Sequence, residues 1–221
     1  MNDEAAAHYV GIIDQMTLGL RLLNDTFGHC GVPNIAWQID PFGHSREQAY
    51  IFSKMGYEAQ FFARLDYRDK LKRQEELSME MMWKTSDEED KQIFTGTKSI
   101  SIIIQDFSDF YSGVLYNDYA SPAGLCWDWA CFDDPLMDVD MVYGNNIEDK
   151  ADILLQFAYE QSKYYQTNNV LLTMGEDFQY QAAHTWFMNL DKIINYINNR
   201  QNDFNVNIFY STPGTQFYSS K

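Results

Sequence analysis

Strand-like apolar runs alternate with helix-length amphipathic segments along this chain, and this alternation limits the folds that it can adopt. The predicted helices cover residues 4–27, 45–55, 66–84, 148–165 and 178–199, and the predicted strands cover residues 34–39, 57–63, 169–174 and 205–210. Strands that are separated by helices of about ten or more residues are typical of right-handed crossover connections. The pattern therefore predicts an α/β fold with a mostly parallel sheet.

Length, charge and hydropathy narrow the class of protein. The chain has 221 residues, of which 45% are hydrophobic, and this is enough for the buried core of one domain or of a large part of one. A net charge of −16 disfavours nucleic acid or an anionic membrane surface as the main partner. No apolar run reaches the length of about 18 residues that indicates a membrane span, and the first residues, MNDEAAAHYV, lack the features of a signal peptide. We expect no nucleic-acid partner, no membrane span and no signal peptide in this sequence.

The cysteines give a weak indication of the compartment. Cys126 and Cys131 enclose four residues in the segment CWDWAC, whereas Cys30 stands apart. The residues alone leave open a short-loop disulfide or two reduced, buried thiols, and reduced thiols are the commoner state in an intracellular chain. Asn24 begins a glycosylation sequon, which matters only in a secreted protein. Both features point weakly to the secretory route.

Two acidic residues each follow a predicted strand. Asp40 comes directly after strand 34–39 in IAWQIDPFGHS, and Asp177 follows strand 169–174 in GEDF. The carboxyl ends of parallel strands form the edge at which α/β enzymes bind their ligands, so the two carboxylates could face one crevice. Such a pair suits glycoside hydrolysis, which needs one ionised carboxylate and one carboxyl that protonates the leaving oxygen. Turn residues or helix N-caps are the alternative roles for both acids.

Several motifs resemble one enzyme family. The runs AWQIDPFGHSREQA, ARLDYRDK, CWDWAC, TMGEDFQYQAAHTWFMNLDKII and FYSTP together resemble the lysosomal-type α-mannosidases of glycoside hydrolase family 38. The resemblance covers residues 2–219 with an interruption at about 97–113. It implies that the chain is part of the family's N-terminal catalytic α/β domain, a seven-stranded barrel-like sheet. Because the resemblance stops before the helical and β-rich regions that follow in the family, we expect residues 1–221 to be a fragment of a larger enzyme.

The resemblance implies specific roles for five residues. Asp40, in DPFGHS, matches the nucleophile of a retaining α-mannosidase, and Asp177 matches the general acid/base. In retaining glycosidases the two carboxyl groups lie about 5–5.5 Å apart. Phe42 matches an aromatic residue beside the mannose ring, Arg64 an arginine that binds the nucleophile or the sugar, and Tyr119 an active-site tyrosine. The implied substrate is a mannose-containing oligosaccharide derived from N-glycans.

The resemblance also implies a zinc cofactor, for which Asp40 is the ligand on this chain. The family completes the site with a His-x-Asp motif upstream and a histidine downstream of the matched region, so we expect the site to be incomplete here. His44 and His184 do not match family ligands, and Glu176 is expected to support Asp177. The first hypothesis is therefore an incomplete part of an α-mannosidase that is inactive alone. The alternative is a non-catalytic carbohydrate-binding or interaction module.

Two further expectations come from the resemblance. It favours a Cys126–Cys131 disulfide, with Cα atoms about 4.4–6.8 Å apart, a free Cys30, and a lysosomal or secreted protein. It also predicts an insertion at about 97–113, either a translated intron or a natural loop insertion, which should form no central strand. Neither the residues nor the resemblance decides between a monomer and an oligomer.

Overall fold

The computed structural model describes residues 1–86, 109–139 and 144–215. The chain divides into two compact units. The first comprises Met1–Tyr116, Tyr164–Gln166 and Pro213–Lys221, and the second comprises Asn117–Lys163 and Thr167–Thr212. Each unit has its own buried core. Within the described ranges, no helix combines the length and the apolar character needed to cross a membrane.

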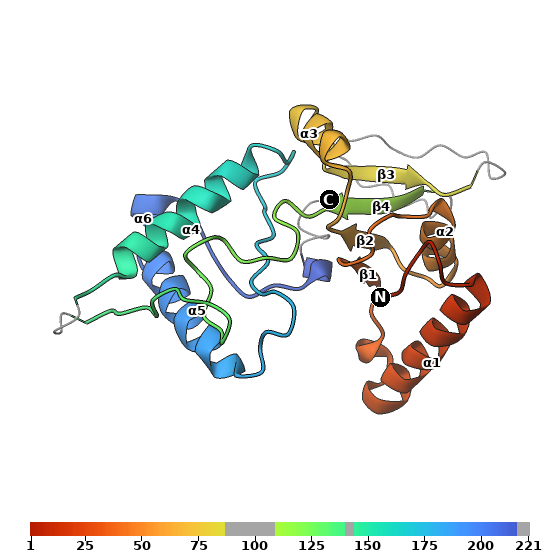
Figure 1. Cartoon of the computed structure of the whole chain (residues 1–221), viewed down its shortest axis with the longest axis horizontal. Helices are drawn as coiled ribbons and strands as arrows, with labels where there is room; N and C mark the ends of the chain where they lie inside the picture. Colours follow the sequence, from red (N-terminus) through yellow and green to blue (C-terminus); the bar gives the residue numbers. More distant parts are fainter. Residues whose placement is uncertain (87–108, 140–143, 216–221) are drawn as a thin grey trace. The chain divides into compact units, whose positions relative to one another are not determined.

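The first unit is built on a four-stranded mixed sheet (Figure 1). Its strands are β1 (Ile35–Gln38), β2 (Ala59–Phe62), β3 (Glu80–Lys84) and β4 (Asp109–Val114), in the order β1-β2-β4-β3. The pairings β1–β2 and β2–β4 are parallel, whereas β3 pairs with β4 antiparallel. The predicted α/β class is confirmed, and the described strands form an open mixed sheet.

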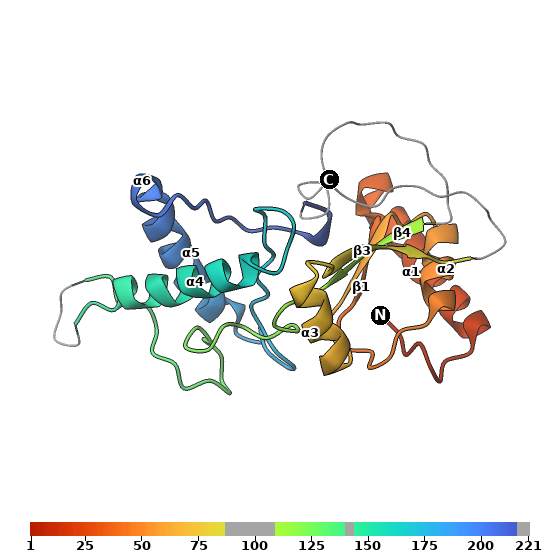
Figure 2. The same ribbon diagram turned by 90° about the horizontal axis from the view of Figure 1, so that it is seen from above.

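Helices connect and cover these strands. They are α1 (Tyr9–Phe27), the short 3-10 helix η1 (His29–Gly31), α2 (Arg46–Lys54) and α3 (Tyr67–Glu75). The first turn of α2 is capped by Ser45, whose hydroxyl accepts from the amide of Gln48 at 3.3 Å, as the Ser-x-x-Gln pattern predicts. Ala36 of β1 packs in one cluster with Phe52 of α2, and Met16 of α1 lies against that cluster. The helices α1 and α2 lie together on one side of the sheet in both views (Figures 1 and 2).

The position of β4 corrects one expectation. The predicted insertion at 97–113 was expected to form no central strand, but its last residues, 109–113, lie in β4 between β2 and β3. Gly113 is suited to this place, because an added Cβ would lie 2.5 Å from the ring of Phe61 on the adjacent strand. Residues 97–108 lie outside the described residues. Whether the segment is an insertion stays a prediction.

The predicted helix 66–84 is wrong in its second half. The helix α3 ends at Glu75, and the backbone of Leu77 is left-handed, with φ 54°. The amide of Ser78 donates to the carbonyl of Arg73 at 2.8 Å and that of Leu77 to Gln74 at 3.4 Å, which is the Schellman pattern of a helix end. After this turn the chain enters β3, where pairing with β4 overrides the helix preference of Glu and Met side chains.

The second unit is a helical layer over a core of aliphatic side chains and two tryptophans. Its helices are α4 (Ile147–Ser162), α5 (Ala183–Asn198) and the short α6 (Gln201–Phe204). Trp186 of α5 is fully buried and packs in one cluster with Leu154 of α4 and with Trp127. The predicted helix 178–199 begins later than expected, because Phe178 and Tyr180 have left-handed backbones.

The two strands predicted in this unit are absent from the described residues. Residues 169–174 and 205–210 are irregular, although Leu172 and Ile208 pack against the helical core as apolar strand residues would. A side chain supplies the backbone hydrogen bonds that a neighbouring strand would otherwise make to Ile208. The amide group of Asn198 accepts from the backbone N–H of Ile208 at 2.9 Å and donates to its C=O at 2.7 Å. Both backbone groups of Ile208 are thus satisfied without a ladder.

The disulfide expected from the resemblance is confirmed. Cys126 and Cys131 are bonded, and their Cα atoms lie 5.6 Å apart, within the expected range. Cys30 is a free, exposed thiol, also as expected. The bridge closes a tight loop at the start of the second unit.

A pair of Phe→Ala substitutions tests the core of the first unit. Phe62 in β2 is 2% exposed, whereas Phe42 in the same unit is 83% exposed. We expect Phe62→Ala to lower the free energy of unfolding by about 3–5 kcal/mol, because it leaves a cavity in a packed core. Phe42→Ala should change it by less than about 0.5 kcal/mol. Urea denaturation measures both, and equal losses would contradict this description of the core.

Candidate functional site

Asp40 lies just beyond the carboxyl end of β1 and is held by Arg64, which lies just beyond the carboxyl end of β2. The Arg64 Nε and its terminal nitrogen donate to Asp40 Oδ1 at 3.2 and 3.0 Å, and Nε also reaches the Asp40 carbonyl at 2.9 Å. The strands β1 and β2 are parallel neighbours, which brings the two residues to one edge of the sheet. Arg64 thus contacts Asp40, one of the two partners that the resemblance implies for it.

The energy of this ion pair argues for an orienting role. The Asp40 side chain is 58% exposed and that of Arg64 is 42% exposed. An ion pair in such contact with solvent contributes about 1 kcal/mol or less to stability. Two donor contacts to Oδ1, with a third to the backbone carbonyl of Asp40, nevertheless restrict how the carboxylate can turn. The pair is thus better suited to fixing the direction of a carboxylate than to stabilising the fold.

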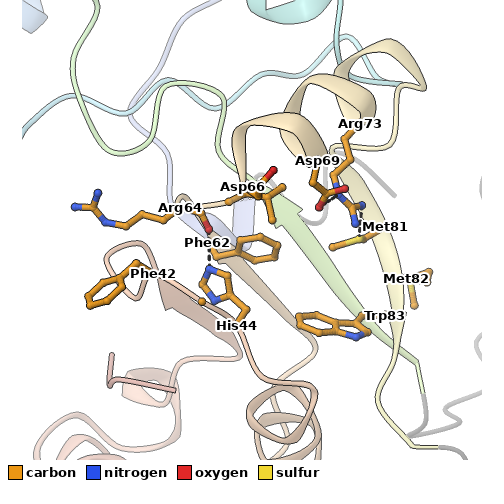
Figure 3. Close-up of a pocket in the computed structure, with 12 residues that line it drawn as sticks. Phe42, His44, Phe62, Arg64, Asp66, Asp69, Arg73, Met81, Met82 and Trp83 are labelled. Carbon is orange, nitrogen blue, oxygen red and sulfur yellow. Dashed lines mark hydrogen bonds and ion pairs between the residues drawn. The ribbon is translucent and has the colours of Figure 1, made fainter. Parts of the chain in front are cut away.

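Arg64 of this pair also contributes to the lining of a pocket of about 640 Å³ (Figure 3). It is lined by Phe42, Gly43, His44, Phe62, Arg64, Leu65, Asp66, Asp69, Arg73, Met81, Met82 and Trp83. Phe62 and Trp83 contribute aromatic surface, and charged side chains such as Asp69 and Arg73 pair with each other at 3.1 Å. Aromatic surface beside polar groups suits a neutral ligand that has both apolar faces and hydroxyl groups. Phe42 and Arg64 line this pocket, whereas Asp40 is not among its lining residues.

A buried acid and a histidine support the loop that carries Asp40. The side chain of Glu4 is 2% exposed, and its Oε1 lies 3.0 Å from Nδ1 of His44, whose side chain is 7% exposed. The Glu4 carboxylate also accepts from the amide of Ser45 at 2.7 Å and from the side chain of Gln38 at 2.8 Å. The Nε2 of His44 lies 2.9 Å from the carbonyl oxygen of Arg64. Each ring nitrogen thus faces an oxygen, and the ring donates to both only when it carries two protons.

This network joins Glu4 to both sides of the Asp40–Arg64 pair. Through Ser45 and His44 it holds the end of the DPFGHS loop, and through the Arg64 carbonyl it holds the segment after β2. Sequence reasoning missed Glu4, because it is separated from His44 by 40 residues. Its neighbours in the sequence, NDEAAA, suggest an ordinary exposed acid before a helix.

Asp177 lies in the second unit, and its surroundings differ from the expectation. It was expected at the end of a strand, but it occupies a turn after an irregular segment. Tyr119 donates its phenolic hydroxyl to Asp177 Oδ1 at 3.4 Å, so these two predicted residues lie together. Glu176 Oε2 lies 3.4 Å from the amide of Asp177, which agrees with a supporting role.

The predicted site residues thus fall into two groups. Asp40, Phe42 and Arg64 lie together in the first unit, and Tyr119 and Asp177 lie together in the second. The expectation that Asp40 and Asp177 share one crevice stays a prediction. Within the ranges that the structure describes, no three His, Cys, Asp or Glu side chains are grouped so that they could hold a metal ion. These residues alone therefore do not fit a zinc site.

Removal of Glu4 tests the buried network. We expect Glu4→Ala to lower the free energy of unfolding by about 2–3 kcal/mol or more, because the Gln38 side-chain amide and the Ser45 N–H lose their acceptor at about 1–3 kcal/mol each. Glu47→Ala is the matched control, since Glu47 is an exposed acid in the first turn of α2 and contributes at most about 1 kcal/mol there. Chemical denaturation at neutral pH measures both changes. A loss no larger than that of the control would show that the network does not stabilise the unit.

Comparison with known proteins identifies the family. Residues 1–220 match the family model of the glycosyl hydrolases family 38 N-terminal domain. Similar relatives include the lysosomal alpha-mannosidases of Cavia porcellus and Homo sapiens, both 48% identical over 214 residues, and that of Bos taurus, 47% identical over 215 residues. Each match covers 96% of this chain and 20% of the relative, so the chain spans a fifth of their length. The extent of the family match shows that the chain belongs to the N-terminal domain family of the family 38 glycosyl hydrolases.

Proposed function

We propose that this chain is an incomplete part of a retaining α-mannosidase that removes terminal α-linked mannose from N-glycan-derived oligosaccharides. The observation that carries the proposal is the Asp40 carboxylate, held by Arg64 at the carboxyl edge of β1 and β2, beside a pocket with aromatic surface. Membership of a glycosyl hydrolase family supports it, as do relatives named lysosomal alpha-mannosidase. The same names support a lysosomal or secreted location.

The proposal assigns a chemical role to each carboxylate. Asp40 is the nucleophile that attacks the anomeric carbon and forms a mannosyl-enzyme. Asp177 first protonates the leaving oxygen and then removes a proton from the water that releases mannose. Arg64 orients the nucleophile through its contacts to Oδ1, and Tyr119 donates a hydrogen bond to the acid/base. Phe42 offers an exposed ring at the edge of the pocket, against which a sugar face can pack.

The cofactor and the domain belong to the same proposal. Asp40 is the zinc ligand that the family resemblance assigns to this chain, and the other ligands would come from outside residues 1–221. Because the described residues hold no three-ligand cluster, we assign no step of the reaction to zinc. We further propose that the four-stranded sheet is part of a larger, seven-stranded barrel-like domain, with residues 97–113 as an insertion.

Substitution of the two carboxylates tests the proposal in a longer α-mannosidase chain that contains this sequence. We expect Asp40→Asn and Asp177→Asn each to lower kcat for an aryl α-mannoside by about 10²–10⁴-fold or more, because each removes a group that reacts with substrate. A fluorinated mannosyl fluoride should label the peptide that contains Asp40, and the first product should be α-mannose. Asp134→Asn, which removes an exposed carboxylate, should leave kcat unchanged.

Two results would overturn the assignment. Labelling of a carboxylate other than Asp40 would exclude it as nucleophile, and a β-configured first product would exclude retention. The chain of residues 1–221 alone should bind zinc weakly and hydrolyse the substrate negligibly. Strong zinc-dependent turnover by that chain would show that the ligand set is misjudged. Binding of mannosides without turnover in the longer chain would instead support the carbohydrate-binding module.

A further inference from the structure

The disulfide loop Cys126–Cys131 encloses an aspartate with an unusual set of partners. Asp128 Oδ2 accepts from the backbone N–H of Tyr180 at 2.7 Å and from the indole N–H of Trp186 at 2.6 Å. Its Oδ1 accepts from the amide of Trp129 at 2.8 Å. Two of these three donors come from the segment that follows Asp177, more than 50 residues away along the chain.

The rest of the disulfide loop binds the same segment. The indole of Trp129 donates to the carbonyl of Phe178 at 3.4 Å, and the hydroxyl of Thr185 donates to the carbonyl of Trp127 at 2.6 Å. The side-chain amide of Gln179 lies 3.6 and 3.7 Å from the two sulfur atoms of the bridge. The contacts therefore span residues 178–186, from the turn that bears Asp177 into α5.

The turn after Asp177 needs such support because its backbone is unfavourable. Phe178 and Tyr180 have φ values of 60° and 66°, a region in which a bulky side chain is strained by about 1–2 kcal/mol per residue. Residues 176–182 belong to neither a helix nor a strand. A conformation of this kind persists only where neighbouring groups hold it, and Asp128 accepts directly from the amide of one of the two strained residues.

Asp128 is well suited to this task because it is a charged acceptor. The hydrogen bond from the Tyr180 amide, followed by that from the Trp186 indole, lowers the pKa of the Asp128 carboxyl. The group is therefore ionised at neutral pH, and hydrogen bonds to an ionised carboxylate are roughly twice as strong as those between neutral groups. Trp186 adds rigidity, since it is fully buried and stacks on the Tyr180 ring with centroids 5.0 Å apart.

We propose that Asp128 is a positioning residue that fixes the turn at residues 177–180 and thereby the direction of the Asp177 carboxylate. The disulfide keeps Asp128 in place, and the Tyr119 hydroxyl meets Asp177 from a second side. This positioning role does not require Asp128 to contact substrate. An effect of Asp128 on catalysis rests on the proposed role of Asp177. The hydrogen bonds by which Asp128 fixes the turn do not depend on that role.

Hydrogen exchange on the 221-residue chain tests the hold directly. We expect the Tyr180 amide and the Trp186 indole proton to exchange slowly in the unsubstituted chain. Asp128→Asn should accelerate exchange at both by about tenfold or more. Both protons go to the same carboxylate oxygen, and Asn replaces this charged acceptor by a weaker neutral one whose NH2 group would then face the Trp129 amide. Amides of α4 serve as an internal reference, and Asp134→Asn is the matched control, since it removes an exposed carboxylate of the same region.

The outcomes separate the two parts of the inference. Unchanged exchange at Tyr180 and Trp186 in Asp128→Asn would overturn it. If that variant does not fold, exchange of the Tyr180 amide in the unsubstituted chain as fast as that of an unstructured amide would overturn the inference, and slow exchange would support it, because Tyr180 lies outside helices and strands and its amide donates to Asp128. In the longer active chain, Asp128→Asn should lower kcat several-fold and leave KM nearly unchanged. It should also alter the part of the pH–rate profile that depends on the acid/base Asp177, which a loss of stability alone would not do. If Asp177→Asn has no effect on turnover but Asp128→Asn still frees the turn, the proposed function fails and the hold stands.

Discussion

Parallel pairing between β1 and β2 is the constraint on which the first half of the candidate site depends. Residues 35–38 of β1 face residues 59–62 of β2 in register, so the chain leaves both strands at the same edge of the sheet. Asp40 and Arg64 lie two residues beyond these ends, where a guanidinium and a carboxylate can meet. A shift of this register by one residue would turn the side chains of one strand to the opposite face and break the pair. The buried Glu4–His44 contact then holds the two loops that carry the pair.

The second unit places its acid by different means. Asp177 lies in a turn that follows an irregular segment rather than a strand, so sheet geometry does not orient it. Side chains supply the missing order. Asn198 satisfies both backbone groups of Ile208, and Asp128, fixed by a disulfide loop, accepts from the segment after Asp177. The acid that follows β1 and the acid in this turn thus depend on separate supports, one on strand pairing and one on side-chain acceptors.

Sequence reasoning predicted the elements whose signals are local. The Ser45 cap and the apolar spacing of 4–27 predict helices close to those observed, and the apolar runs 34–39 and 57–63 predict β1 and β2. The predictions were wrong where contacts with residues distant in the sequence determine the conformation. The strand β3 consists largely of residues that favour helices and depends on β4 for its conformation. Residues 169–174 and 205–210 have the apolar character of strands, but the Leu171 carbonyl accepts from the side chain of Gln161 and the Ile208 amide donates to that of Asn198.

The residues of the candidate site likewise divide into those with local sequence signals and those whose partners are distant in the sequence. The resemblance and the strand ends together identified Asp40, Phe42 and Arg64, because these residues lie in short motifs with a fixed order. Glu4 and Asp128 were missed as supporting residues, since their partners lie about 40 and 50 residues away and neither acid stands in a local pattern that signals burial or pairing. Charged side chains that support a site from a distance become visible only when the fold is known.

The central claim is that the carboxylates of Asp40 and Asp177 act on one glycosidic bond. It is tested most directly by the distance between the two carboxyl groups in an experimentally determined structure of the longer chain with a mannoside bound. The account predicts a separation of about 5–5.5 Å, with one carboxyl group on each side of the scissile bond. Carboxyl groups that lie more than about 9.5 Å apart, or that open onto different surfaces of the domain, would contradict it.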